Sequence, residues 1–219
     1  MDFFRKNISY LYETGKIEED LYQQFSENQH PELNSILLIS DIAGITTDNL
    51  LKQDLRAQAE VPSDLRLIIF DIDGVMTDGG MFYTESGDEL KKFNAKDGLA
   101  IRMLNHAGFE TGIISHGTNI NLIKKRADIV HIKHVYCGVE PKSDVLMRWC
   151  DSLEITPQQV AFIGDDVNDL SIINIVGFSA CPADALPAVK NAVNVVLSRK
   201  GGDACVREWI DNYLLKSGI

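Results

Sequence analysis

The sequence predicts an α/β protein with a central parallel sheet flanked by helices, preceded by a helical appendage. Downstream of Pro62, short aliphatic runs alternate with stretches of helical periodicity, and this alternation is typical of βαβ units with right-handed crossovers. Upstream of Pro62, apolar residues recur at helix-like spacing. The 219 residues are enough for one well-buried domain with an appendage, and 45% apolar and 24% charged residues are the balance of a folded globular protein.

A domain boundary is predicted where polar and turn-forming residues 60–64 precede the aliphatic run 65–70. We therefore divide the chain into an appendage of unknown role, residues 1–63, and a domain, residues 64–219. In the appendage, Ser35–Leu55 is compatible with one or two short helices. It carries no chemical motif.

The predicted strands and helices of the domain follow from its apolar runs and periodic stretches. Between the first strand and the first helix, two apolar segments flank a Ser-Gly-Asp turn within residues 79–93. We interpret them as a protruding β-hairpin, which leaves no room for a large cap domain. The strands are expected at Leu67–Phe70, Thr111–Ile114, Ile129–Ile132, Val160–Ile163 and Asn194–Leu197, and the helices at Gly98–Ala107, Asn119–Ala127, Ser143–Leu153 and Asp169–Val176.

Two carboxylates follow the first predicted strand. Asp71 and Asp73 stand two residues apart on extended backbone, so their side chains point to the same side just beyond the strand end. Like charges converge only where a cation or a proton lies between them. An isolated pair of this kind is usually two acidic turn residues, but the aliphatic strand before it and Gly74 after it favour a metal and phosphate site.

A second acidic group follows the strand Val160–Ile163. Asp165 is a hard oxygen donor of the kind that Mg²⁺ prefers, and we expect it to bind the metal directly. We expect Asp166 and Asp169 to support Asp165 without binding the metal themselves, although both could instead be acids that favour a helix N-terminus.

The remaining candidates lie where a strand or loop meets a helix. Ser115 and His116 lie in a small hydroxyl-rich turn after a strand, where a hydroxyl and backbone N–H groups form a phosphate cradle. Taken alone, Ser115 would be an ordinary N-cap. Lys142 begins a helix, where a lysine is usually exposed. By itself such a lysine indicates little, and it is only the motif order described next that assigns Ser115, His116 and Lys142 to phosphate binding.

Taken in order, strand-DxD, strand-Ser, loop-Lys and strand-GDD resemble the motif set of the haloacid dehalogenase superfamily of phosphohydrolases. The resemblance covers roughly Leu65 to Leu215. The resemblance is most detailed to the small, capless branch that acts on 2-keto-3-deoxy sugar acid phosphates, either octulosonate 8-phosphate or nonulosonate 9-phosphate. The stretches that carry it are residues 71–80, 92–98, 164–170 and 201–208.

The resemblance implies a magnesium-dependent phosphatase. Asp71 would form an aspartyl-phosphate, and Asp73 would act as acid and base. Mg²⁺ would be held by Asp71, Asp165 and the backbone carbonyl of Asp73. The resemblance also implies a homotetramer in which the hairpin and C-terminal tail of one subunit help to close a neighbour's site.

The sugar-acid end of the substrate is expected at charged residues after the hairpin and on the next helix. The chain departs from the branch here, because His116-Gly117-Thr118 is one residue longer than usual, Lys96 replaces the usual arginine, and Asp203 replaces a commoner glycine. The identity of the sugar therefore stays open. The candidates for this end are Lys96, Asp97, Gly98, Lys125 and Arg126.

Composition excludes several classes of partner. A formal net charge of −11 disfavours nucleic acid, whose phosphates recruit clustered Lys and Arg. The four cysteines are far apart, so neither a zinc knuckle nor a disulfide framework is indicated. No signal peptide or apolar span of about 18 residues is evident, and we expect a cytoplasmic protein that binds no membrane.

Two alternatives stay open. The chain could be a non-catalytic domain of this fold that serves oligomerisation or regulation, like the domains fused to acylneuraminate cytidylyltransferases. It could also be a phosphatase of another small phosphate ester, with the helical appendage narrowing the entrance.

Overall fold

The computed structural model of the protein describes residues 3–26 and 31–215. The chain divides into two compact units, residues 1–60 and residues 61–219, called here the helical unit and the sheet unit. Among the described residues, every helix is too short or too polar to span a lipid bilayer.

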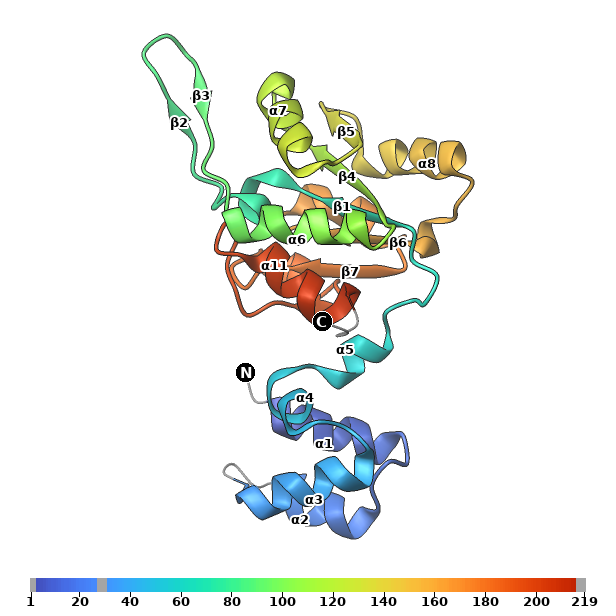
Figure 1. Ribbon diagram of the computed structural model, residues 1–219. Coiled ribbons are helices and arrows are strands. Elements are labelled where there is room, and N and C mark those ends of the chain that lie inside the picture. The colour runs from blue at the N-terminus through green and yellow to red at the C-terminus, as the bar shows by residue number, and fades with distance from the viewer. Residues whose placement is uncertain (1–2, 27–30, 216–219) are drawn as a thin grey trace. The chain divides into compact units, whose positions relative to one another are not determined.

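The helical unit is built around one apolar cluster. In its first helix, Phe4, Ile8 and Leu11 recur at helical spacing and are buried, because they form the inward face of an amphipathic helix. Side chains also cap the short helices: Thr46 accepts from the backbone N–H of Asn49. The helices are α1 (Phe3–Glu13), α2 (Glu19–Ser26), α3 (Leu33–Ala43), α4 (Thr47–Lys52) and α5 (Leu55–Ala59) (Figure 1).

The sheet unit contains the predicted parallel sheet. Within the described residues it has six strands in the order β5-β4-β1-β6-β7-β8, and every adjacent pair is parallel. β1 and β6 lie at its centre and are buried at every position, as expected for a sheet covered on both faces. The strands are β1 (Leu67–Phe70), β4 (Glu110–Ser115), β5 (His134–Cys137), β6 (Val160–Ile163), β7 (Phe178–Cys181) and β8 (Val195–Val196).

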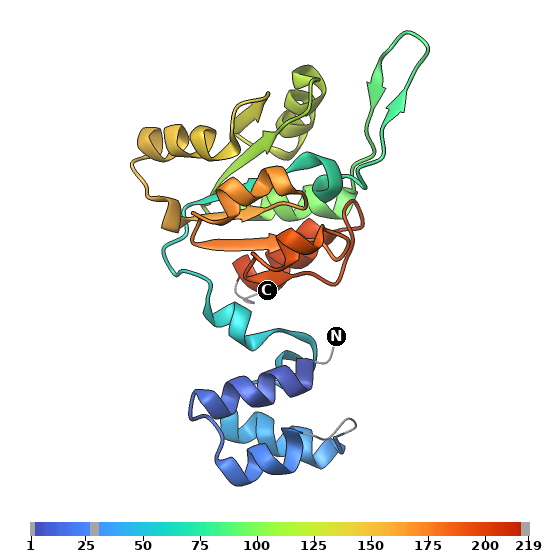
Figure 2. The ribbon, with the colours of Figure 1, turned by 180° about the vertical axis from the view of Figure 1, so that it is seen from behind.

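Helices cover both faces of this sheet (Figures 1 and 2). On one face, Phe70 packs edge-on against Trp209, with ring centroids 6.2 Å apart. On the other face, Phe162 joins a cluster with residues of α8 and α9, including Val145 and Ile172. The helices are α6 (Ala95–His106), α7 (Ile120–Val130), α8 (Lys142–Leu153), α9 (Leu170–Ile173), α10 (Pro187–Lys190) and α11 (Cys205–Trp209), with short helical turns η1 (Ile72–Met76), η2 (Pro157–Gln159), η3 (Val167–Asp169) and η4 (Ile210–Leu214).

One strand assigned from the sequence was wrong, and two strands of the sheet, β5 and β7, were not predicted. The strand expected at Ile129–Ile132 is the end of α7, because His131 adopts a left-handed conformation (φ 63°) and the N–H of Ile132 closes the helix on the carbonyl of Ala127. The true strand, β5, follows directly. β7 was missed because Phe-Ser-Ala-Cys lacks the β-branched residues that mark a strand.

The segment between η1 and α6 forms a β-hairpin. Its strands are β2 (Phe82–Tyr83) and β3 (Glu89–Leu90), which pair antiparallel. Figure 1 shows the hairpin projecting away from the sheet. Since this segment holds only a hairpin, the carboxyl edge of the sheet has no large cap within the described residues.

Candidate active site

Three neighbouring strands end at the same edge of the sheet, and each delivers one predicted functional residue. Phe70 of β1 pairs in register with Ile113 of β4 and with Ile163 of β6. The residues that follow, Asp71, Ser115 and Asp165, therefore gather at the carboxyl edge, which is where ligands bind in open α/β sheets.

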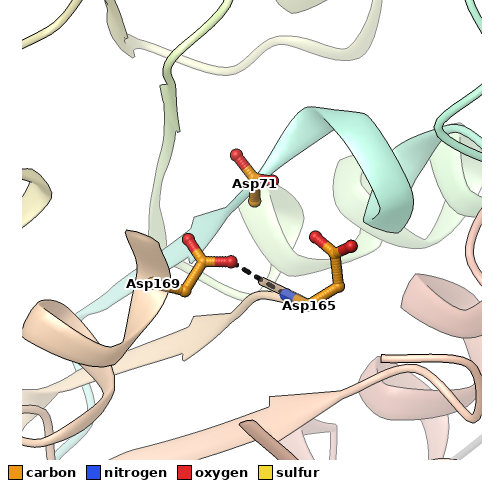
Figure 3. Close-up of side chains that lie close together, drawn as sticks. All are labelled: Asp71, Asp165 and Asp169. Carbon is orange, nitrogen blue, oxygen red and sulfur yellow. Dashed lines mark hydrogen bonds between the residues drawn. The ribbon is translucent and has the colours of Figure 1, made fainter. Parts of the chain in front are cut away.

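Three carboxylates converge at this edge (Figure 3). One oxygen from each of Asp71, Asp165 and Asp169 lies within 4.8 Å of the other two. Burial and then the neighbouring charge of Asp169 raise the pKa of Asp71 to about 7, against the attraction of Lys142. Burial followed by the charges of Asp71 and Asp169 raises the pKa of Asp165 to about 8. The cluster therefore favours a bound cation or proton.

Lys142 lies beneath this cluster and is fully buried. Its Nζ atom donates to Asp71 Oδ1 at 2.7 Å and to Asp169 Oδ1 at 2.5 Å. Burial alone lowers the pKa of this amine, but the two carboxylates outweigh it and raise the pKa above its ordinary value. A lysine at a helix start is usually exposed, but Lys142 is buried because α8 begins against the strand ends.

Asp169 supports the other two acids. Its second oxygen accepts from the backbone N–H of Asp165 at 2.8 Å and of Asp166 at 3.2 Å, which fixes the turn after β6 (Figure 3). Asp166 itself is exposed and caps the N–H of Val167. Gly164 permits this close turn, because a Cβ atom there would lie 2.4 Å from Asp169 Oδ2.

The donor set fits Mg²⁺. Asp165 Oδ1 is buried and makes no hydrogen bond within the described residues, so it is an acceptor that lacks a partner. Both oxygens of Asp169 are already engaged, which leaves Asp71 and Asp165 with free ligand capacity. Carboxylate oxygens are the protein ligands that Mg²⁺ uses alongside water and phosphate.

Asp73 contacts a residue that the sequence analysis did not select. Lys91, at the base of the hairpin, donates from Nζ to Asp73 Oδ1 at 2.5 Å and to Glu89 Oε1 at 2.9 Å. The side chain of Lys91 is only 2% exposed. A lysine beside the exposed hairpin strands carries no local signal, and only the alternation of side chains along β3 could have directed it inward.

Ser115 and His116 both lie in the turn after β4. Ser115 is buried, and its Oγ accepts from the N–H of Gly117 at 3.0 Å. His116 is half-buried, with Nε2 located 3.0 Å from the carbonyl oxygen of Glu140 and Nδ1 located 3.1 Å from Asn168 Nδ2. Both ring nitrogens therefore contact protein.

The five residues expected at the sugar-acid end differ in burial, and Arg126 is half-buried. Lys96 and Lys125 are exposed. Asp97 and Gly98 are buried at the packing of α6: Asp97 Oδ1 accepts from the N–H of Arg207 at 2.8 Å, and burial raises the pKa of Asp97 to about 6. The guanidinium of Arg126 stacks over Phe93, 4.8 Å from the ring centroid, and donates to the Asn94 carbonyl. The role of all five at the substrate stays a prediction.

Comparison with known proteins places this geometry in context. A family model described as haloacid dehalogenase-like hydrolase matches residues 140–207. The 3-deoxy-D-manno-octulosonate 8-phosphate phosphatase of Yersinia pestis is 39% identical over 153 residues, which are 70% of this chain and 81% of that protein.

Solved structures give the same result. The crystal structure of the Yersinia pestis phosphatase superposes with a TM-score of 0.69 at 37% identity, over 74% of this chain and 86% of that chain. The phosphatase of Moraxella catarrhalis, solved in complex with a magnesium ion, a phosphate ion and a KDO molecule, superposes with a TM-score of 0.68 at 26% identity, over 71% of this chain and 88% of that chain.

Proposed function

The chain belongs to the haloacid dehalogenase-like hydrolases that include the 3-deoxy-D-manno-octulosonate 8-phosphate phosphatases, and we propose that it is a magnesium-dependent phosphatase of a 2-keto-3-deoxy sugar acid phosphate. The observation that carries this proposal is the buried contact of Lys142 with Asp71, next to an Asp165 oxygen that has no hydrogen-bond partner among the described residues. The lysine leaves one Asp71 oxygen free to act as a nucleophile at a site that attracts cations.

The proposed reaction has two chemical steps. In the first, a carboxylate oxygen of Asp71 forms a bond to phosphorus while the bond from phosphorus to the sugar oxygen breaks, and Asp73 donates a proton to that oxygen. In the second, Asp73 takes a proton from water, whose oxygen attacks phosphorus and releases phosphate from Asp71. Dividing the displacement in this way replaces one hard step by two easier ones.

The other residues of the site stabilise charge. Lys142 is fixed by Asp71 and Asp169, so its ammonium group is in place before the substrate arrives and costs little reorganisation. Ser115 supplies a hydroxyl at the neighbouring strand end for a phosphoryl oxygen. A bound Mg²⁺, held by Asp71, Asp165 and the Asp73 carbonyl, would neutralise phosphoryl oxygens.

A purely structural or regulatory role is less consistent with the same observations. Three carboxylates facing one ammonium group leave an excess of negative charge in a buried place. Burying unbalanced charge is costly unless a proton or a cation compensates it, and above the raised pKa values of Asp71 and Asp165 only a cation can do so. A domain that serves only oligomerisation would have no use for such a destabilising cluster.

The finer parts of the proposal concern the leaving group and the assembly. We place the sugar acid toward Lys96, Asp97, Gly98, Lys125 and Arg126. The exposed apolar residues of the hairpin, Phe82, Tyr83 and Leu90, support a homotetramer in which it contacts a neighbouring subunit. A cytoplasmic location, with no nucleic-acid or membrane partner, remains our expectation from the sequence.

The test is phosphate release from a panel of phosphate esters with Mg²⁺. The panel holds octulosonate 8-phosphate, nonulosonate 9-phosphate, hexose 6-phosphates and p-nitrophenyl phosphate. We expect the highest kcat/KM with one of the two sugar acid phosphates, and no detectable turnover by Asp71→Asn or after chelation of the metal.

The outcomes separate the alternatives. Preference for a hexose phosphate would keep the phosphatase and overturn the substrate class. Wild-type protein that releases no phosphate from any ester, while folded and saturated with Mg²⁺, would favour the non-catalytic alternative. Unchanged turnover by Asp71→Asn would overturn the mechanism.

A further inference from the structure

We propose that His116 is a positioning residue that joins the loops carrying Ser115, Lys142 and Asp169 into one rigid site. The activity tests of this inference rest on the proposed function, whereas its hydrogen-exchange test rests on geometry alone. It departs from the phosphate-binding role expected from the sequence, because both ring nitrogens contact protein atoms.

The contacts of His116 fix its tautomer. The carbonyl of Glu140 can only accept, so Nε2 must carry the proton and donate across the 3.0 Å distance. In the neutral ring Nδ1 is then an acceptor, which suits the amide Nδ2 of Asn168 at 3.1 Å. One side chain thus satisfies a donor and an acceptor on two different loops.

Each of these loops continues directly into the catalytic cluster. Glu140 is followed by Pro141 and Lys142, whose Nζ reaches Asp71 and Asp169. Asn168 precedes Asp169, which accepts from Lys142 and from the N–H of Asp165. The contacts therefore close a ring that runs from His116 through Glu140, Lys142, Asp169 and Asn168 back to His116.

The third loop, which carries Ser115, is connected to this ring of contacts through the backbone. His116 follows Ser115 at the end of β4, so fixing the imidazole fixes the turn that carries the Ser115 hydroxyl. The Glu140 end is also held within its own segment, because its N–H donates to Tyr136 Oη at 3.1 Å and its carboxylate pairs with Arg148. His116 connects this already ordered loop to its two neighbours.

Small displacements at such a site have large kinetic effects. A misplacement of about 1 Å can cost on the order of 100-fold in rate. His116→Ala and Asn168→Ala should each lower kcat/KM about tenfold, and the double variant should be within about threefold of either one, because both changes break the same connection. His116→Gln keeps one donor and one acceptor and should stay within about threefold of wild type.

The matched control is His106→Ala, which removes an exposed histidine at the end of α6 and should leave kcat/KM unchanged. The leaving group supplies a second criterion. Because Lys142 and Asp169 act at the phosphoryl end, His116→Ala should lower kcat/KM by the same factor for a sugar acid phosphate and for p-nitrophenyl phosphate. A loss confined to the sugar substrate would overturn the proposal and assign His116 to sugar binding.

Hydrogen exchange of the metal-free full chain tests the connection without any activity. Amides of segments 138–142 and 165–169 should exchange about tenfold faster in His116→Ala and in Asn168→Ala, and at the wild-type rate in His106→Ala. Exchange unchanged in both segments, or additive losses of kcat/KM in the double variant, would overturn the proposal. An inactive wild-type protein with the expected exchange pattern would instead count against the phosphatase function alone.

Discussion

Two fully buried polar side chains, Asn7 in the helical unit and Lys142 in the sheet unit, have opposite surroundings. The amide of Asn7 donates to the carbonyls of Leu50 and Gln53, at 2.9 and 2.7 Å, and accepts from the N–H of Leu55 at 3.0 Å. These are backbone groups at the end of α4 and the start of α5. The neutral side chain is fully satisfied and completes the fold.

Lys142 is buried among more charge than it can balance. It pairs with Asp71 and Asp169, while Asp165 adds a third carboxylate, whose Oδ1 atom accepts no hydrogen bond from the part of the chain that the structure describes. A buried polar group that makes all its hydrogen bonds within the protein stabilises the fold. A buried cluster with excess negative charge is instead suited to bind a ligand of opposite charge. We therefore expect Asn7 to serve packing and Lys142 to serve the proposed reaction, although both side chains are equally buried.

The largest expected effect is at Lys142. Lys142→Met leaves Asp71 and Asp169 without their counter-ion, so we expect kcat to fall about 1,000-fold and the free energy of unfolding to fall by about 3 to 5 kcal/mol. Turnover of the preferred phosphate ester and guanidinium denaturation measure the two. Lys124→Met, on the exposed face of α7, is the control, and equal behaviour of the two variants would contradict the assignment.

The counterpart in the helical unit is Asn7→Ala. It removes the side-chain partner of the Leu50 and Gln53 carbonyls and of the Leu55 N–H, so the free energy of unfolding of the helical unit should fall by about 3 kcal/mol. The value of kcat at a temperature where the protein is folded should stay within about twofold. Hydrogen exchange of α1 and α4 measures the loss of stability, and steady-state kinetics measure kcat. Asn34→Ala, at an exposed position of α3, should change neither. A large fall in kcat would mean that the helical unit takes part in catalysis.

Magnesium should compensate the excess charge of the cluster in a pH-dependent way. Because the pKa values of Asp71 and Asp165 are raised to about 7 and about 8, the metal-free protein loses stability as pH rises through this range and the carboxylates ionise. Mg²⁺ binds the ionised carboxylates, so it should raise Tm more at about pH 9 than at about pH 6. At a concentration 100 times its Kd it should increase the free energy of unfolding by about 3 kcal/mol. Asp165→Asn should remove most of the difference, and equal shifts at both pH values would argue against a metal at these carboxylates.

The smallest effect is expected at Asp97, which is buried like Lys142 but lies at the packing of α6 and α11. Its raised pKa, about 6, means that its favourable contribution is present below about pH 4 and is lost as pH rises through 6. Asp97→Asn keeps the bond from the Arg207 N–H, so its stability relative to wild type should increase by about 2 kcal/mol between about pH 4 and pH 7. Denaturation curves across this range, with the exposed Asp128→Asn as control, measure it; a pH-independent difference would contradict the raised pKa.

Local sequence signals were sufficient where the chain is regular. The aliphatic runs of β1 and β6 marked the central strands, and the chain order placed Asp71 and Asp165 just beyond their ends, where the structure brings the two carboxylates together. They failed where tertiary context overrides propensity, as in the β-branched residues of Ile129–Ile132, which end a helix because Ala127 and Val130 are buried at helical spacing.

The sequence by itself determined the α/β class, the motif order and the residues at each strand end, because side-chain periodicity and chain order are local properties. Only the tertiary structure decided that Lys142 is buried between Asp71 and Asp169, that Lys91 reaches Asp73, and that His116 connects two loops. These contacts join residues that are distant in the chain, and their geometry depends on strand register and on how close the helices pack.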